Sequence, residues 1–537
     1  MRDNLLNWYC DNLPISYPVK IRNTYEKCYI KSRTNYTLWL DKINKKFGDD
    51  IDWWMTVVPS RNPYLSDILH YISVLETIKE TKLSKIKIHS QSKELLKLIE
   101  KNFSNKKITC EFVENKEHKT NLFFNILKSF LFHFFLFIYI NLFEKKKLNK
   151  NLVIIDKFIT QNFNQNLNYF PELNKTKYCI VPTFIPTINF IKLIKMIKFT
   201  KKNNKNILWK EHYINFGDII FALLNYLRRK KFKKSTYWYK NFNLSLLIYK
   251  EIEKFNDYFS VAAGLINYRF FLRLSKYNFL NIQSINWFEN QIIDKGWNMG
   301  FKKYFTKFKK NSFGYQDFNK HYNLISNSPS KSEYEKNVTP ENLVVISKYF
   351  KKITCEFFKK QKIIIGETHR FRNLIKLKIK PTNKKKVLFI LSGIKKIDIE
   401  LIKIAKKISI LDPKNNFYIK CHPILKKNFI VKENLPKNLI FLDTKLSLIL
   451  KETLVSITAG PSSAILESIC HGTFLILPDI ECGTSFNPKM FGFKNYIVTD
   501  NEIKILRKIK KIIKRKTDFK NNNFINKEKF KYLSEIT

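Results

Sequence analysis

The sequence predicts an α/β protein made of two lobes in series, each with a parallel sheet covered by helices. Apolar stretches of strand length alternate with segments of helical periodicity over 151–366 and again from 387 onward, and such alternation is typical of parallel sheets. A polar, basic and proline-containing stretch at 376–386 separates the two series and has the composition of an interdomain linker.

Length and composition agree with several folded domains. At roughly 150 residues per domain, the 537 residues correspond to two to four domains. The 44% hydrophobic content excludes a disordered chain, and 12 Gly and 16 Pro exclude a collagen-like one. The parts we expect are an N-terminal α/β segment (1–118), an apolar helical region (119–147), a first lobe (148–375), a second lobe (376–520) and a polar tail (521–537).

The N-terminal segment has its own series of strands and helices. The series is a strand over Asp52–Val58, a helix over 65–82, a strand over 85–89, a helix over 92–102 and a strand over 108–113. Asp50 and Asp52 have the spacing of an acidic pair that holds a divalent metal on a sugar nucleotide. Because the pair precedes its strand, we interpret it as a surface turn and predict no metal site.

Charge and missing motifs narrow the function classes. The 98 Lys and Arg residues against 45 Asp and Glu give a net charge of +53, which suits nucleic acid, an anionic membrane face or phosphorylated substrates. Lys, Asn, Ile, Phe and Tyr are all frequent, so A- and T-rich codons explain part of the excess. No helix-turn-helix, RNP or zinc-finger pattern supports nucleic acid. No GxGxxG, P-loop, HExxH or GxSxG is present either, which argues against common dehydrogenases, NTPases, zincins and serine hydrolases.

The cysteines and the N-terminus predict the compartment. The eight cysteines lie far apart without a CxxC pair, as expected in a reducing cytoplasm. The N-terminal residues lack the apolar core of a signal peptide.

The stretch Asn121–Phe143 is the most apolar of the chain. Polar residues interrupt it at four positions, whereas a spanning helix needs about 20 predominantly apolar residues. Three interpretations stay open: a helix at the membrane interface, a membrane span, or a helix buried in the protein. The basic amphipathic segment at 502–515 suits docking on anionic lipid. The apolar stretch and the basic segment at 191–202 agree with that, although core packing with frequent Lys explains all three nearly as well.

Three loops of the second lobe directly follow predicted strands. Ser392 and Gly393 follow the strand at 387–391, His422 follows 417–421, and Thr458–Ser463 follows 454–457. Open α/β sheets bind ligands at the carboxyl ends of their strands. An imidazole donates to a phosphate, and a helix that starts at Ser462 offers free N–H groups to an anion. The alternative is that Ser462 only caps its helix.

These loops resemble the nucleotide-binding lobe of GT-B glycosyltransferases. The resemblance lies in the order strand–Ser-Gly, strand–His-Pro and strand–xAGPSSAxLESxxxG–strand over 387–480. The His-Pro and Ser-Ser pairs are similar to those of bacterial sialyltransferases and of capsule or teichoic-acid polymer synthases. Upstream stretches are similar to bacterial surface-carbohydrate biosynthesis proteins: Trp53-Trp54 with Arg61-Asn62-Pro63, Trp287–Gln291, and Gly314-Tyr315-Gln316. The acidic-pair-glycine motif that supplies the base in sialyltransferases is missing, which puts a sialic acid donor in doubt.

The resemblance implies two Rossmann-like lobes that face a cleft, and a metal-independent glycosyltransferase of lipopolysaccharide or capsule assembly. A nucleotide-sugar is then the donor substrate, without a further cofactor. The resemblance places three residues on the donor phosphate, His422, Ser462 and Ser463. It places Gly460 and Glu467 on the nucleotide, and we expect Ser392 and Gly393 beside them at the same edge of the sheet.

The first lobe should supply the base that activates the acceptor. Glu289 is our candidate, because it follows a strand and stands beside Trp287; an exposed glutamate at a helix start is the alternative. Arg370, in the cluster Glu367–Arg370, and Gln316 are further candidate contacts to phosphate or acceptor. We expect a saccharide or lipid-linked acceptor at the inner face of the cytoplasmic membrane. The alternative functions are a non-catalytic scaffold of the polysaccharide machinery and a basic nucleic-acid-binding protein.

Overall fold

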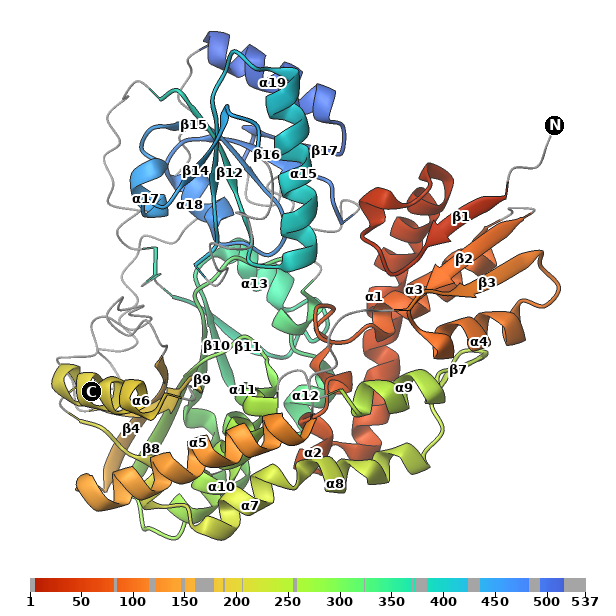
Figure 1. The fold of residues 1–537 in the computed structure, drawn as a ribbon. Helices are drawn as coiled ribbons and strands as arrows, with labels where there is room; N and C mark the ends of the chain where they lie inside the picture. The colour runs from red at the N-terminus through yellow and green to blue at the C-terminus, as the bar shows by residue number, and fades with distance from the viewer. Residues whose placement is uncertain are drawn as a thin grey trace.

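The computed structural model describes most of the chain, and these residues form an α/β protein. Two parallel sheets have six strands each and a third has three, and helices connect many of their strands (Figure 1). The predicted fold class is confirmed: two sheet-based lobes, an additional N-terminal α/β segment and an apolar helix. The described residues are 5–81, 85–114, 122–145, 150–159, 178–186, 189–204, 206–254, 258–322, 324–366, 368, 370–371, 384–423, 435–481 and 493–515. The expected tail, 521–537, and most of the expected linker, 376–386, lie outside them.

The first lobe is built on a sheet with the strand order β11-β10-β9-β8-β4-β5. Its strands are β4 (Asn151–Ile159), β5 (Tyr178–Phe184), β8 (Asn281–Trp287), β9 (Ser312–Gln316), β10 (Asn342–Val345) and β11 (Lys362–Ile365). The main helices are α5 (Leu122–Phe143), α6 (Phe190–Asn203), α7 (Phe216–Leu223), α8 (Asn225–Arg228), α9 (Ser245–Ile252), α10 (Tyr258–Leu274), α11 (Ile292–Tyr304), α12 (Lys331–Glu335) and α13 (Lys348–Thr354). Because all six strands are parallel, their carboxyl ends share one edge of the sheet.

The second lobe repeats this plan with the strand order β14-β13-β12-β15-β16-β17. Its strands are β12 (Lys386–Ile390), β13 (Phe417–Lys420), β14 (Leu439–Leu442), β15 (Thr453–Thr458), β16 (Phe474–Pro478) and β17 (Tyr496–Thr499). The helices are α15 (Lys395–Leu411), α17 (Leu446–Ile449), α18 (Ala464–Cys470) and α19 (Glu502–Arg515). The strands that the sequence predicted at 387–391, 417–421 and 454–457 match β12, β13 and β15 to within a few residues, because each is a short apolar run followed by turn residues.

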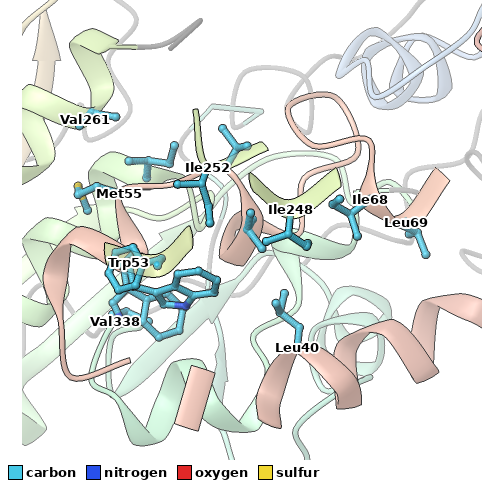
Figure 2. Close-up of a cluster of buried hydrophobic side chains, with 14 of the residues drawn as sticks. Leu40, Trp53, Met55, Ile68, Leu69, Ile248, Ile252, Val261 and Val338 are labelled. Carbon is cyan, nitrogen blue, oxygen red and sulfur yellow. The ribbon is translucent and has the colours of Figure 1, made fainter. Parts of the chain in front are cut away.

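The N-terminal segment forms a small parallel sheet, β1-β2-β3, beside the two lobes (Figure 1). Its elements are β1 (Leu6–Tyr9), α1 (Val19–Phe47), α2 (Ile51–Trp54), the 3-10 turn η2 (Val58–Ser60), α3 (Ile68–Glu80), β2 (Ile86–Ser90), α4 (Lys93–Asn102) and β3 (Ile108–Phe112). Figure 2 shows Leu40 and Trp53 of this segment in one buried cluster with Ile248 and Val338 of the first lobe. The segment therefore shares its hydrophobic core with the first lobe.

The predicted strand at Asp52–Val58 is wrong, because residues 51–54 form helix α2 and 58–60 form η2. The Asp50 side chain caps α2 by accepting a hydrogen bond of 3.0 Å from the Asp52 N–H. Asp52 is not on a surface turn either. It is buried and receives hydrogen bonds of 2.7 Å from Arg228 Nε and from Asn225 Nδ2, so the acidic pair anchors α2 to α8.

Helix α5 has one face inside the protein and one face outside. Phe132, Leu136 and Ile140 are buried against α6 and the ends of β4 and β5. Seven large apolar side chains of α5 are exposed: Phe123, Phe124, Leu127, Leu131, Ile138, Leu142 and Phe143. Within the described residues, α5 is long and apolar enough to cross a membrane by length and composition. Its inner face instead packs within the first lobe.

A buried carboxylate, Glu333 at the start of α12, joins three parts of the chain. Arg61 of the N-terminal segment contacts it at 2.5 Å, and Lys295 of α11 contacts it at 3.0 Å. The Asn290 amide donates to it at 3.1 Å, and the Ser330 N–H donates at 2.9 Å as part of the cap of α12. Burial works to raise the pKa of Glu333, but Arg61 and Lys295 hold it below the ordinary value.

We expect Glu333→Gln to lower the free energy of unfolding by roughly 3 to 5 kcal/mol, because it leaves Arg61 and Lys295 as uncompensated buried charges. Since the folded-state pKa lies below the unfolded one, the effect is complete above pH 4.5 and fades as the pH falls through the folded pKa. Urea unfolding at several pH values measures this. Glu335→Gln, on the same helix in an exposed pair with Lys331, is the control and should cost about 0.5 kcal/mol or less. Equal effects of the two substitutions would contradict the proposed importance of Glu333.

Candidate donor site between the two lobes

The three loops singled out in the second lobe lie side by side. They follow β13, β12 and β15, which are neighbours in the sheet. Gly393 has a φ of 92°, and a Cβ there would come within 2.8 Å of His422 Nδ1. Gly460 has a φ of 72°, and a Cβ there would come within 3.4 Å of the Ser392 side chain. Both glycines thus adopt a conformation that side chains disfavour, and the loops meet at close range.

The Ser392–Gly393 loop is held by a carboxylate that the sequence did not indicate. Asp398, in the first turn of α15, accepts from the Ser392 N–H at 2.6 Å, the Ser392 hydroxyl at 2.9 Å and the Gly393 N–H at 2.9 Å. Burial raises the pKa of Asp398, and these hydrogen bonds oppose that rise. These N–H and hydroxyl groups of Ser392 and Gly393 are hydrogen-bonded to Asp398 within the second lobe. The loop therefore forms the surface next to His422.

The Ser-Ser loop also differs in detail from its expected form. Helix α18 begins at Ala464, has seven residues and is preceded by Ser463. The Ser462 hydroxyl accepts from the Ala464 N–H at 3.3 Å, as in the capping alternative. Glu467 lies half-buried one turn into α18. Burial raises its pKa, while the positive charges of Arg370 and Lys445 oppose that rise.

Arg370 of the first lobe lies next to this group. Burial lowers the pKa of His422, and the positive charge of Arg370 lowers it further. The charge of Arg370 is therefore near enough to His422 and to Glu467 to act on both. The structure therefore brings together, from two lobes, the cation and the imidazole for which the sequence suggested phosphate contacts. Two other members of the Arg370 cluster, Glu367 and His369, lie outside the described residues.

Asp317, at the end of β9, holds the turn that carries Arg370. Its carboxylate accepts from the Thr368 hydroxyl at 2.6 Å and from the Arg370 N–H at 2.7 Å. Sequence reasoning missed Asp317, although the run Asp317-Phe318-Asn319-Lys320-His321 directly follows the Gly314-Tyr315-Gln316 stretch. A dense polar run after an apolar strand was the signal that could have found it.

Glu289 lies at the carboxyl end of β8, at the same edge of the first-lobe sheet as Asp317. Its carboxylate accepts from Trp287 Nε1 at 2.9 Å and from the Gln291 amide at 2.5 Å. Burial strongly lowers the pKa of Lys320, and the charge of Glu289 opposes that effect. Gln316 is fully buried, accepts from Lys320 and donates to the Asn327 carbonyl at 3.1 Å. Gln316 therefore holds the Lys320 ammonium group in place.

The two lobes touch where these residues meet. The Asn319 amide donates to the Ser462 carbonyl at 3.3 Å across the interface. An apolar cluster runs beneath this contact, with Phe288, Tyr315 and Val345 of the first lobe and Ile465 and Leu466 of α18. Within the described ranges, no three His, Cys, Asp or Glu side chains come together as a metal site.

Comparison with known proteins finds similarity in structure only. No family model matches the sequence, and no curated protein matches it. Among solved structures, the chain is similar to Acinetobacter baumannii MurG (TM-score 0.34, 8% identity, 70% of this chain and 92% of that chain) and to TarM (TM-score 0.36, 13% identity, 69% and 93%). It is also similar to Arabidopsis thaliana UGT89C1 complexed with UDP (TM-score 0.38, 11% identity, 68% and 90%). At these TM-scores the similarity carries no conclusion about activity.

We expect Gly393→Ala to displace the His422 ring and to lower the free energy of unfolding by about 1–3 kcal/mol, because the new methyl group meets His422 and the positive φ is strained. The measurements are the imidazole NMR signals of His422 and denaturant unfolding. Gly217→Ala is the control, because a Cβ there meets only Asn215 Oδ1 at 3.4 Å. Unchanged His422 signals in Gly393→Ala would contradict the close approach of the two loops.

Proposed function

We propose that the protein is a glycosyltransferase that transfers a sugar from a nucleotide-sugar donor to a saccharide acceptor. The observation that carries the proposal is the position of Arg370, a first-lobe cation that acts on His422 and Glu467 at the carboxyl edge of the second-lobe sheet. That edge is where open α/β sheets bind nucleotides. A cation and a neutral imidazole at such an edge suit the phosphates of the donor.

The proposed roles involve residues of both lobes. The bond between the sugar carbon and the phosphate oxygen breaks, and its electron pair leaves with the nucleotide phosphate. Arg370 and an N–H of His422 stabilise the charge that grows there. Glu289 takes the proton of the acceptor hydroxyl, whose oxygen forms the new bond to the sugar. The proposed roles of Gly460, Ser462, Ser463 and Glu467 are to line the nucleotide side, and the transfer is proposed to need no metal.

We further propose that the acceptor is lipid-linked and that the exposed face of α5 rests on anionic lipid. The exposed face carries seven large apolar side chains, and neither α5 nor α6 contains an acidic residue. Lys128 of α5 and Lys145, just after it, are exposed, and so are Lys195 and Lys198 on the neighbouring helix α6. Apolar side chains with a cationic rim match the interface of an anionic bilayer. The proposed setting is the cytoplasmic side of a bacterial inner membrane, in lipopolysaccharide or capsule assembly.

The first test measures the binding of CMP, UDP and GDP to the protein by ligand-detected NMR. We expect one of them to bind, and His422→Ala to weaken that binding at least tenfold by removing a donor to phosphate. Glu289→Gln should bind the nucleotide as the wild type does and lose turnover of the matching nucleotide-sugar. A folded protein that binds none of the nucleotides would overturn the transferase proposal. Binding without turnover in the wild type would favour the scaffold alternative.

The second test concerns the membrane. We expect the protein to sediment with vesicles of phosphatidylcholine and phosphatidylglycerol, and less so as salt rises, because salt screens the lysines. Leu131→Asp combined with Ile138→Asp should reduce the bound fraction at least tenfold. Ile410→Asp, at a more exposed apolar position on α15, is the control and should bind as the wild type does. Equal binding of the double variant would exclude α5 as the contact surface.

A further inference from the structure

The segment that follows β9 contacts both lobes. Asn319 Nδ2 donates to the Ser462 carbonyl at 3.3 Å, and His321 Nε2 lies 3.9 Å from a carboxylate oxygen of Glu481. The other side chains of the segment have partners in the first lobe. Asp317 holds the Arg370 turn, Phe318 lies 5.8 Å from the Trp287 ring, and Lys320 donates to the Asn327 carbonyl at 3.1 Å.

Two of these side chains carry polar atoms without hydrogen bonds to any described residue. They are Oδ1 of Asn319 and both ring nitrogens of His321. Asn319 is 5% exposed and His321 is 2% exposed. Buried polar groups in folded proteins are almost always hydrogen-bonded to protein, water or ligand, so these three atoms are available to a polar partner that enters between the lobes.

The three unpaired atoms are complementary to the hydroxyl groups of a sugar. Burial lowers the pKa of His321 to about 3, so its ring is neutral and offers one donor and one acceptor. The Asn319 oxygen is an acceptor. A hydroxyl group both donates and accepts, whereas a phosphate at neutral pH mainly accepts and would repel the Asn319 oxygen and the neighbouring Glu481.

The position agrees with this chemistry. Asn319 touches Ser462, which lies in the same turn as Gly460, and Glu481 follows β16, the next strand in the sheet. A sugar bonded to a phosphate among these loops lies within reach of the facing first-lobe segment. Lys320, between the two residues, is near enough to the proposed base Glu289 to be affected by its charge. The sugar of the donor would therefore lie between the donor phosphate, at the second-lobe loops, and the acceptor, at the first lobe.

We propose that Asn319 and His321 bind hydroxyl groups of the sugar carried by the donor and select that sugar. This inference rests on the proposed function. It adds a first-lobe subsite that holds the transferred sugar and is separate from the groups that hold the nucleotide.

The test compares a free nucleotide with its sugar conjugates by titration calorimetry. The pairs are UDP with UDP-glucose and UDP-N-acetylglucosamine, GDP with GDP-mannose, and CMP with CMP-N-acetylneuraminate. We expect His321→Phe, which keeps the ring volume and removes both nitrogens, to bind the free nucleotide within twofold of the wild type. It should bind the preferred nucleotide-sugar at least tenfold more weakly. Asn319→Ala should show the same split.

His133→Phe is the matched control. His133 is another buried neutral histidine of the first lobe, on α5, with its Nε2 unpartnered among the described residues, so both affinities should stay unchanged. Equal weakening of nucleotide and nucleotide-sugar by His321→Phe, or no weakening of either, overturns the subsite. A wild type that binds no nucleotide overturns the proposed function and the subsite with it. Thermal melting of each variant separates these results from a loss of folding.

Discussion

The structure depends most on the burial of one charge, the carboxylate of Glu333. A carboxylate in the protein interior is tolerated only with cationic and hydrogen-bonding partners. Here those partners come from the N-terminal segment through Arg61, from α11 through Lys295 and from the turn after β8 through Asn290. Asn290 has a φ of 58°, a strained conformation that its bond to Glu333 helps to hold. Because Glu289 precedes Asn290 directly, the buried ion cluster fixes the backbone that carries the proposed base.

A second constraint acts between the lobes. One apolar cluster contains side chains of α18 and of both large sheets. The two lobes therefore meet through an apolar layer, and polar loops surround it. Arg370 reaches the second lobe only because Asp317 holds its turn at the end of β9. Arg22 of α1 adds a contact on another side, where it contacts Asp479 at 3.2 Å and Asp500 at 2.5 Å. The N-terminal segment is thus attached to the second lobe through Arg22.

The second lobe was predictable because its signals are local. Each strand there is an apolar run that ends in a glycine, proline or hydroxyl residue, and those residues form the loops at the sheet edge. The failures have tertiary causes. Asp52–Val58 has the composition of a strand, but Asp50 caps a helix there and Trp53 and Trp54 are fully buried in the shared core. The polar run after β9 could have marked Asp317, but its role follows from its partners at 368 and 370. The pairing of Arg61 with Glu333 joins the N-terminal segment to the first lobe. A single sequence gives no measure of such distant contacts.

The apolar helix α5 is another element whose surroundings the sequence alone did not determine. Composition left interface, span and core open for α5, because exposed and buried apolar residues contribute equally to it. The structure separates them: Phe132, Leu136 and Ile140 pack inward, while Phe124, Leu131 and Ile138 face outward. The outward face belongs to the lobe that carries Glu289 rather than to the nucleotide side. An acceptor anchored in lipid would approach the protein from the lobe that carries the proposed base, while the water-soluble donor would enter at the second lobe. The proposed division of the reaction between two lobes would then match a division of its substrates between membrane and water.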